Sequence, residues 1–274
     1  MEEINTDKLR EHSRAIRWGA TYAIGSIGAG HIGGCLSVAE LLAVLYFHVM
    51  NIDPLNPRME GRDRLIMSKG HAGPALYAAL AERGYFDKNL LGTLNSLGTT
   101  LPSHADMNKT PGIDMTAGSL GQGFSCAVGV AIGSKLKKDG ACIYAVIGDG
   151  ESQEGQIWEA AMYAAHMKLD NLIAFTDNNK LQIDGFTDRI NSLGDICAKW
   201  ESFGWYTDRV DGHDPAAIIE AIKRAKEVTG RPSMIILDTI KGKGVAFVEQ
   251  AATANHNMKL TKEQTAQALE ELSL

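Results

Sequence analysis

The stretch ACIYAVIGDGESQEG, residues 141–155, decides the fold class of this chain. It begins with the unbroken apolar run Ala141–Ile147, which is typical of a strand buried on both faces of a parallel sheet. The run leads directly into a Gly-Asp-Gly turn centred on Asp149. A helical pattern follows around residues 158–166, and a second apolar run, Asn171–Thr176, comes after it. We therefore predict a strand–helix–strand unit with polar residues where each strand ends.

Strands and helices alternate on both sides of this unit. Apolar runs predict further strands at Arg64–Ser68, Trp205–Val210 and Ser233–Ile240. Helical periods predict helices over Leu9–Ile27, from Ser37 almost to Asp53, and over Ala75–Phe86, Phe124–Lys135, Pro215–Val228 and Leu260–Leu274. This alternation predicts an α/β fold, a doubly wound parallel sheet with helices on both faces, in a single domain covering residues 1–274.

Polar residues at the two strand ends have the chemistry of a metal site. Asp149 and Asn179 lie thirty positions apart, the length of one strand–helix–strand unit, so both would stand at the same edge of the sheet. Carboxylate, amide and carbonyl oxygens suit Mg²⁺ or Ca²⁺, and Mg²⁺ usually keeps phosphate oxygens and water in its shell. Gly148 and Gly150 let the backbone approach a diphosphate and donate amides to it. Although a Gly-Asp-Gly tripeptide alone is an ordinary turn, the pairing predicts a metal–diphosphate site.

The stretch SIGAGHIGG, residues 26–34, matches the GxGxxG fingerprint of dinucleotide-binding proteins, and Asp53 stands about twenty residues further on. That fingerprint has to follow a strand. Here the preceding residues have a helical period, and Ser37 and Glu40 have the spacing of a capping box that begins the next helix. Because no room is left for a second strand, we reject a nicotinamide cofactor and expect the glycines to form a loop between two helices.

Three histidines, His31, His71 and His104, each follow a Gly or Ser in a predicted loop. A single histidine in such a loop is usually a surface residue. Three of them in loops that the fold would bring to one sheet edge favour a functional cluster, because imidazole passes protons near neutral pH. The three are therefore candidate catalytic residues.

Composition excludes several classes of function. The chain has 274 residues, of which 45% are hydrophobic and 22% charged, as in a soluble globular protein. A net charge of −6 argues against nonspecific binding of nucleic acid, and the sequence has no apolar run long enough to span a membrane and no signal-peptide pattern at its start. We expect a cytoplasmic protein. The four cysteines stand singly and are expected to be buried, reduced thiols rather than metal ligands: Cys35, Cys126, Cys142 and Cys197.

From about Ser13 to His256, the sequence resembles the thiamine-diphosphate enzymes, and within them the N-terminal half of transketolase. The motifs that carry the resemblance are GHIGG (with Ile32 where proline is usual), SKGHAGPALY, TAGSLGQG and GDGESQEGQIWEAAMYAAHMKLDNLIAFTDNNKLQIDG. The resemblance implies the diphosphate-binding fold of that family, with thiamine diphosphate and Mg²⁺ as cofactors.

The resemblance also implies a role for individual residues. Asp149, Asn179 and the carbonyl of Leu181 would hold Mg²⁺. The residues expected to contact the cofactor are His71, Gly118, Ser119, Leu120, Gly148, Gly150, Glu154, Asn179 and His256. The histidines expected to surround the reacting groups are His31, His71, His104 and His256. Glu154 would lie at the subunit interface, and the turn KGKG, residues 241–244, would bring lysines toward the diphosphate.

The activity implied by the resemblance is that of a transketolase-type transferase, which moves a two-carbon ketol unit from a ketose or ketose phosphate to an aldose. Transketolases continue with a pyrimidine-binding domain and a C-terminal domain, which this sequence does not contain. The amphipathic helix at its end favours a two-chain enzyme over a truncated one. The expected partner is a C-terminal subunit carrying both missing domains, in a heterotetramer with two copies of each chain.

Two alternatives stay open. One is a different thiamine-diphosphate ketol transferase or synthase, such as a deoxyxylulose-phosphate-synthase-like enzyme, which the KGKG turn resembles; the loop of His104 fits transketolase better. The other is a non-catalytic module that binds thiamine diphosphate. A pure binder needs Asp149 and Asn179 but not three loop histidines, so the histidines favour an enzyme.

Overall fold

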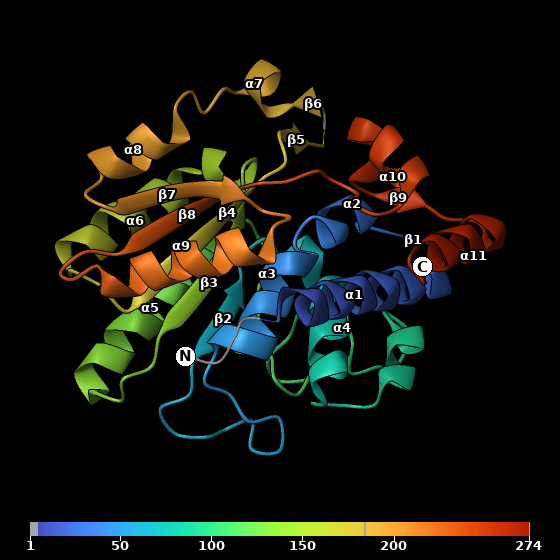
Figure 1. The fold of residues 1–274 in the computed structure, drawn as a ribbon, viewed down its shortest axis with the longest axis horizontal. Coiled ribbons are helices and arrows are strands. Elements are labelled where there is room, and N and C mark those ends of the chain that lie inside the picture. Colours follow the sequence, from blue (N-terminus) through green and yellow to red (C-terminus); the bar gives the residue numbers. More distant parts are fainter. Residues whose placement is uncertain (1–4, 184, 274) are drawn as a thin grey trace.

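The computed structural model describes residues 5–183 and 185–273, and a parallel sheet forms its centre (Figure 1). The sheet has the strand order β2-β3-β4-β8-β7, with every neighbouring pair parallel. Its strands are β2 (Arg64–Met67), β3 (Ile143–Gly148), β4 (Leu172–Asn178), β7 (Tyr206–Asp211) and β8 (Ser233–Asp238). Short pairs lie outside it: β1 (Ala29–Gly30), β5 (Leu181–Gln182), β6 (Gly185–Phe186) and β9 (Met258–Lys259). The predicted doubly wound α/β fold is confirmed.

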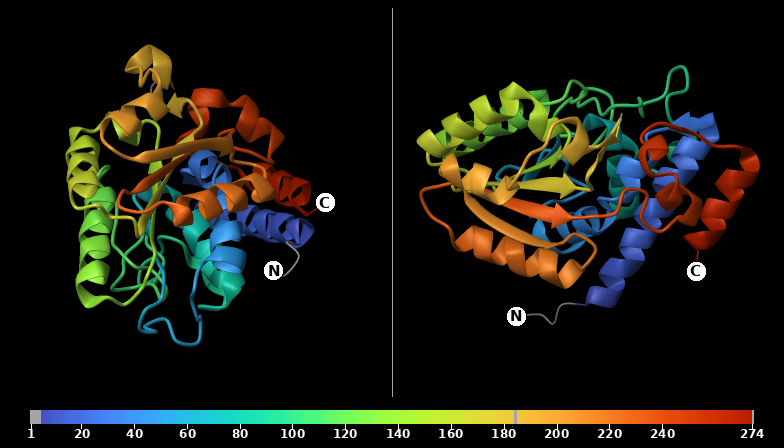
Figure 2. Two further views of the ribbon diagram at one scale, coloured as in Figure 1. Left: turned by 60° about the vertical axis from the view of Figure 1, so that its left-hand side comes forward. Right: turned by 90° about the horizontal axis from the view of Figure 1, so that it is seen from above.

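Helices cover both faces of the sheet (Figure 2). One face packs against α1 (Thr6–Ile27), α3 (Ala39–Val44), α4 (Gly73–Arg83) and α9 (Pro215–Glu227), and the other against α5 (Gln122–Lys137), α6 (Gly155–His166) and α8 (Ile196–Ser202). The remaining helices are α2 (Ile32–Leu36), α7 (Thr187–Ile190), α10 (Ala246–Gln250) and α11 (Lys262–Glu271). Single turns of 3₁₀ or π helix are η1 (Leu45–Val49), η2 (Gly70–Ala72), η3 (Lys88–Thr93), η4 (Glu151–Gln153) and η5 (Ala252–Asn255).

The unbroken apolar run of β3 is explained by burial on both faces. Tyr144 and Val146 belong to the core on the α1 side, whereas Ile143, Ala145 and Ile147 belong to the core on the α5 side. Alternate residues of a strand point to opposite faces, so a strand covered on both sides needs an apolar residue at every position. The prediction of a doubly buried strand is therefore confirmed.

The helix expected from Ser37 almost to Asp53 is interrupted, and its predicted capping box does not form. The chain makes α2, then α3, and ends in the π turn η1, with Val38 as the N-cap of α3. The Ser37 hydroxyl donates to Asp177 at 2.8 Å, while Glu40 receives two hydrogen bonds from Arg17. Tertiary partners therefore outcompete the local cap, and the capping-box prediction is wrong.

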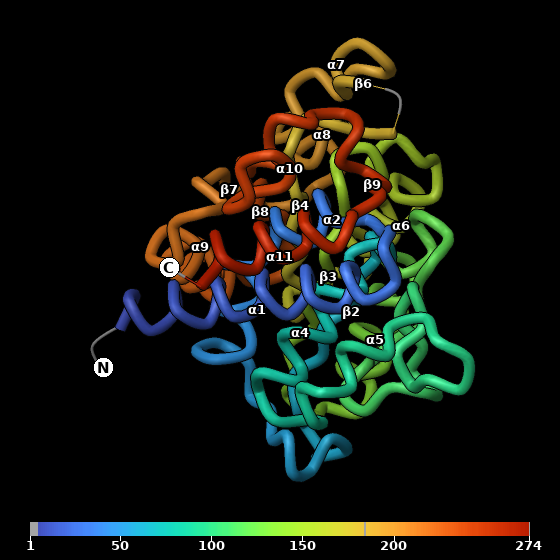
Figure 3. The backbone as a smooth tube through the Cα atoms, turned by 90° about the vertical axis from the view of Figure 1, so that its right-hand side faces the viewer, coloured from blue at the N-terminus to red at the C-terminus, as the bar shows by residue number. Residues whose placement is uncertain are grey.

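The C-terminal segment returns to the start of the chain, where α11 runs beside α1 (Figure 3). The strands β1 and β9 pair antiparallel, with Gly30 opposite Met258. His31 directly follows the first of these residues, and His256 comes two positions before the second. This small ribbon therefore brings two of the sequence-predicted histidines together from opposite ends of the chain.

The cysteines differ partly from expectation. All four are free thiols, but only Cys35 is fully buried; Cys126, Cys142 and Cys197 are half-buried, because they lie near the solvent edges of the core. Burial raises the pKa of the Cys35 thiol to about 12, so it stays protonated at neutral pH. None of the helices in residues 5–183 and 185–273 combines the length and apolar character needed to cross a bilayer.

Candidate active site

Loops from the carboxyl ends of β2, β3, β4 and β8 enclose a hollow of about 330 Å³. Ligands of parallel α/β sheets bind at this edge. The residues that line the hollow are His31, Lys69, His71, His104, Gly118, Leu120, Gly148, Asp149, Gly150, Glu151, Gln153, Glu154, Asn179, Leu181, Gln182, Ile183, Lys241 and His256. Of the site residues predicted from sequence, all of which the structure describes, Ser119 alone is not among them; it is exposed.

Four histidine rings form one cluster at the mouth of this hollow. The centroid of the His31 ring lies 5.6 Å from His71, 5.8 Å from His104 and 5.2 Å from His256. The rings of His71 and His256 are 5.1 Å apart. Because the rings come from four separate loops, only the tertiary fold produces the cluster.

Burial and neighbouring positive charge keep these imidazoles neutral. Burial lowers the pKa of His256 to about 4, and the nearby Lys241 adds to this effect. Burial also places the pKa of His71 well below its usual value, with Lys69 adding to the effect. The pKa of His31 is lowered by burial and by His104. At neutral pH these three rings can therefore accept protons or hydrogen bonds.

Oxygen atoms at the end of β3 and after β4 form the donor set of a hard cation. The Asp149 carboxylate accepts from the amides of Gly150 and Lys180. Asn179 donates its amide N–H to Asp177 at 2.9 Å, which fixes its side-chain orientation. Burial and the charge of Asp177 raise the pKa of Asp149 to about 7, which shows a carboxylate short of compensating positive charge. A divalent cation is the group that this arrangement fits.

Lys241 brings a positive charge to the same donor set. Its Nζ donates to the Leu181 carbonyl at 3.1 Å and lies 3.1 Å from Nδ1 of His256. Burial and the charge of Lys69 lower the pKa of Lys241 to about 8. The side chain of Gln182 also lines the hollow, and its buried Oε1 has no hydrogen-bond partner among the described residues. An ammonium group, backbone amides and an unsatisfied amide oxygen fit a polar, anionic cofactor with a bound metal ion.

A buried ion pair beneath the hollow was not expected from the sequence. Lys69 pairs with Asp177, and both side chains are almost inaccessible to solvent. The Asp177 carboxylate also accepts from Ser37, Thr239 and Asn179. It therefore ties together the loops after α2, β2, β4 and β8. The available signal was Asp177 at a strand end, two positions before Asn179.

Glu151 is a second site residue that was not expected from the sequence. Its carboxylate accepts from the Ser68 hydroxyl at 2.5 Å, from the Gly121 amide at 2.9 Å and from the Gly148 amide at 3.0 Å. These bonds join the loop that holds Gly118 to the ends of β2 and β3. Glu154, by contrast, is exposed at the start of α6 and faces the hollow without a capping bond.

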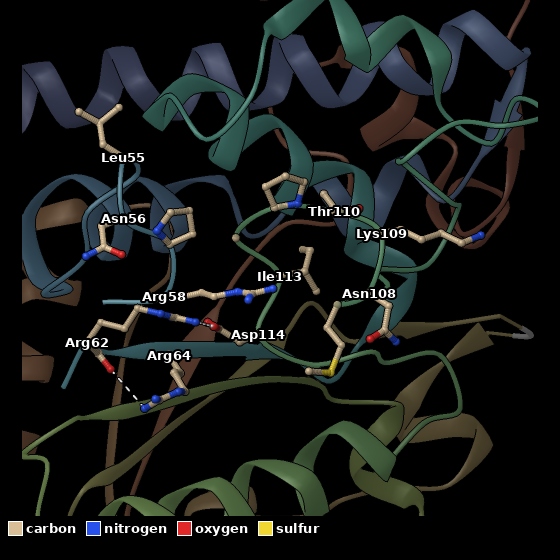
Figure 4. A pocket seen from close by; sticks show the side chains of 14 residues that line it. Leu55, Asn56, Arg58, Arg62, Arg64, Asn108, Lys109, Thr110, Ile113 and Asp114 are labelled. Carbon is tan, nitrogen blue, oxygen red and sulfur yellow. Dashed lines mark hydrogen bonds and ion pairs between the residues drawn. The ribbon is translucent and has the colours of Figure 1, made fainter. Parts of the chain in front are cut away.

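A larger hollow of about 790 Å³ lies at the opposite end of β2, where Arg64 begins that strand (Figure 4). Arg62 pairs with Asp114 there, and Arg64 donates to the carbonyl of Arg62. None of the site residues predicted from sequence, each of which is described, lines it. The chemistry of the histidines and oxygen donors therefore selects the smaller hollow as the candidate active site.

Known proteins resemble the chain over nearly its whole length. The family model described as "Transketolase, thiamine diphosphate binding domain" matches residues 9–274. A 6-deoxy-6-sulfo-D-fructose transketolase subunit from Clostridium sp. strain MSTE9 is 56% identical, over 96% of both chains. One of the two-chain type from Phocaeicola vulgatus, named as a subunit of an apulose-4-phosphate transketolase, is 40% identical over 89% of this chain and 86% of that protein.

A solved structure shows the same fold within a longer chain. The transketolase from Leishmania mexicana superimposes with a TM-score of 0.90 at 29% identity, covering 99% of this chain but 42% of that one. The chain thus spans nearly all of the two subunits but about two fifths of this single-chain transketolase. It belongs to the transketolase family, whose thiamine diphosphate-binding domain it comprises.

Proposed function

We propose that this chain is the N-terminal subunit of a two-chain transketolase and forms a single thiamine diphosphate-binding domain. The observation that carries the proposal is the meeting of four histidines with Asp149, Asn179 and Leu181 in one hollow. An oxygen donor set alone would serve a binding module. The histidine cluster adds proton-transfer groups, which a ketol transfer needs.

The diphosphate half of the site is assigned to residues at the sheet edge. Asp149, the side-chain oxygen of Asn179 and the carbonyl of Leu181 would hold Mg²⁺. Gly118, Leu120, Gly148 and Gly150 would contact the cofactor through backbone, as Ser119 would from the same loop, while Lys241 faces the diphosphate. Bound thiamine diphosphate would supply the electron sink that stores the two-carbon fragment.

The histidines would handle the protons of the sugar. Breaking the C2–C3 bond of a ketose requires removal of a hydroxyl proton from the departing part, and the acceptor aldehyde oxygen must gain a proton in the second half of the reaction. His31, His71, His104 and His256 are placed for these transfers, because neutral imidazoles take up protons where they are needed. The depressed pKa values of His31, His71 and His256 favour the base role.

The proposed partner is a C-terminal subunit with the pyrimidine-binding and C-terminal domains, in a cytoplasmic heterotetramer of two copies of each chain. Relatives named as transketolase subunits support a multi-chain enzyme. Glu154, exposed at the rim of the hollow, would face the interface between the halves. Exposed apolar residues of α6 and the turn after it add to the surface available for assembly, namely Met162, Tyr163 and Met167.

The proposed donor is a ketose that carries a terminal anionic group, either sulfonate or phosphate. Two relatives support this class by their printed names, in which the transketolase acts on 6-deoxy-6-sulfo-D-fructose in one case and on apulose-4-phosphate in the other. Residues that grip the anionic end are expected in the partner, so this chain alone does not choose between the two groups.

The test is a coupled assay of the assembled two-chain protein with Mg²⁺ and thiamine diphosphate. 6-Deoxy-6-sulfo-D-fructose, apulose-4-phosphate and an unphosphorylated ketose would each be offered as donor. We expect cofactor-dependent release of an aldose from at least one anionic ketose. Tight cofactor binding without turnover of any donor would favour the non-catalytic module, whereas condensation of pyruvate with an aldehyde would favour the synthase-like alternative.

A further inference from the structure

A row of hydrogen-bonded side chains connects α1 with the segment that carries Lys241. Arg17 of α1 donates to both oxygens of Glu40 in α3, at 2.7 and 2.6 Å. Nδ1 of His213, in the turn between β7 and α9, lies 3.0 Å from Oε2 of Glu40. Nε2 of the same ring lies 2.8 Å from the backbone nitrogen of Ile240. These three side chains are almost wholly buried.

The partners of His213 fix its tautomer. A backbone N–H can only donate, so Nε2 must carry a lone pair where it meets Ile240. The ring proton therefore sits on Nδ1 and is donated to Glu40. His213 is thus a donor at one ring nitrogen and an acceptor at the other, and no apolar side chain of similar size could fill both roles.

The far end of the row is firmly held. Nε of Arg17 donates to the carbonyl of Leu36 at 3.1 Å, so the guanidinium has no freedom to rotate away from Glu40. Burial raises the pKa of the Glu40 carboxyl, but its bonds with His213 and Arg17 outweigh that effect and lower the pKa. The carboxylate therefore stays charged, and charge-assisted bonds fix the orientation of the His213 ring.

The near end of the row sets the start of the turn that reaches the active site. Ile240 is followed directly by Lys241, whose Nζ bonds the Leu181 carbonyl. Gly242 then donates to the carbonyl of Gly33 at 3.0 Å. The turn containing Gly212 also packs closely on this segment, since a Cβ at that glycine would lie 2.5 Å from the Thr239 methyl group. Lys241 thus leaves the sheet between two anchored backbone amides.

We propose that His213 is a positioning residue for Lys241: it accepts the Ile240 amide and thereby sets where the ammonium group meets the cofactor diphosphate. The inference rests on the proposed function in taking thiamine diphosphate as the ligand. His213 does not line the hollow, so it acts through Lys241 and not by touching the cofactor.

The deciding experiment compares His213→Leu with His213→Gln in the full chain assembled with its partner. Glutamine can donate to Glu40 with its amide N–H and accept from Ile240 with its amide oxygen, whereas leucine can do neither. Thiamine diphosphate affinity in Mg²⁺ would be measured by calorimetry. We expect about a tenfold loss in His213→Leu, equal to about 1.4 kcal/mol, and recovery to within about threefold in His213→Gln. His48→Leu, at an exposed histidine of η1, is the matched control and should bind normally.

A double-mutant cycle separates positioning from general stability. If His213 acts through Lys241, then His213→Leu should cost little further affinity in a Lys241→Met background. An equal loss in both backgrounds, or no recovery in His213→Gln, would overturn the inference.

Hydrogen exchange of the Ile240 amide gives a readout that does not depend on the cofactor. The amide should lose protection in His213→Leu and keep it in His213→Gln. Unchanged protection in both variants would overturn the inference even if affinity changed. A wild-type assembly that binds no thiamine diphosphate would instead refute the proposed function, and the exchange pattern would still decide whether His213 anchors the segment.

Discussion

Single residues at the sheet edge have properties that depend on what surrounds them. Asp149 is a carboxylate that burial makes hard to ionise, with a pKa raised to about 7. His256 is an imidazole that burial makes hard to protonate, with a pKa lowered to about 4. Both shifts disfavour the charged form, as expected where water is excluded. A bound cation would satisfy the first group, and a substrate proton the second.

The first prediction concerns the proposed metal ligand. Asp149→Ala should weaken Mg²⁺-dependent binding of thiamine diphosphate by more than about 100-fold, because the cation loses its only charged ligand in the proposed set. Calorimetry on the assembled enzyme would measure this. Asp7→Ala removes a carboxylate that is 89% exposed and serves as control. Equal affinities in the two variants would refute the metal assignment.

The second prediction concerns His104, whose Nδ1 lies 3.2 Å from the Ser103 hydroxyl. If it moves a substrate hydroxyl proton, His104→Ala should leave cofactor affinity nearly intact. Turnover should fall by roughly 10²–10⁴, the usual range for a positioned acid or base. Steady-state assays of both variants, with the exposed His48→Ala as control, would check this. Wild-type turnover would return His104 to the role of a loop residue.

The third prediction is a pH dependence of stability. The pKa of His256 is about 4 in the folded chain and near 6.5 when unfolded, so the unfolded state binds more protons between these values. The free energy of unfolding should therefore fall as pH drops from about 6.5 toward 4. His256→Gln should flatten that slope in urea titrations of the full chain. A slope identical to wild type would show that the His256 pKa is not depressed by folding.

Secondary-structure elements contribute mainly through their ends. The strands of the sheet finish at one edge, and the loops that follow them would be mobile without cross-links. Asp177, at the end of β4, joins Lys69 from the β2 loop, Ser37 from the α2 loop and Thr239 from the β8 loop. Glu151 makes similar bonds to the β2 loop and the start of α5. Buried carboxylates thus hold the loops in place.

The fourth prediction tests this cross-link. Lys69→Met should destabilise the fold by about 3–5 kcal/mol, because Asp177 is left as an unpaired buried charge. Adding Asp177→Asn should recover part of that loss by removing the charge. Lys88→Met breaks an ion pair at a lysine that is 63% exposed and should cost less than about 1 kcal/mol. Urea unfolding of the full chains measures all three; a double variant no more stable than Lys69→Met would contradict the pairing argument.

At the scale of the whole molecule, the chain presents half of a site. The candidate hollow holds the diphosphate end of the proposed cofactor, and the chain covers about two fifths of the Leishmania mexicana transketolase. Exposed apolar side chains lie on α6, where Met162 is 60% exposed and Tyr163 is 51% exposed. Such surfaces commonly mark a contact with another chain.

The fifth prediction is that this chain alone does not catalyse ketol transfer. A carboxylate that activates the aminopyrimidine of the cofactor would come from the partner, so the isolated chain should bind thiamine diphosphate weakly without turnover. Adding the partner should restore activity and produce, in light scattering, the mass of two copies of each chain. Robust turnover by the purified chain alone would refute the two-chain proposal.

Local patterns in the sequence were enough to predict the sheet and the edge at which the site forms. Apolar runs and helical periods are properties of neighbouring residues, and parallel strands necessarily bring their carboxyl ends to one side. For that reason Asp149, Asn179 and the loop histidines could be placed together from the sequence. Ser37 and Glu40 show the limit: their spacing predicts a cap, but distant partners take both side chains.

Which polar groups meet across the fold depended instead on how the whole chain packs. Lys69 finds Asp177 more than a hundred positions away, and His213 reaches both Glu40 and Ile240. These pairings depend on where loops from different strands come to rest, and neither partner carries a local pattern that marks it. Burial then sets the pKa values of Asp149 and His256, because the loss of water around a side chain is a property of the packed molecule and not of its neighbours in sequence.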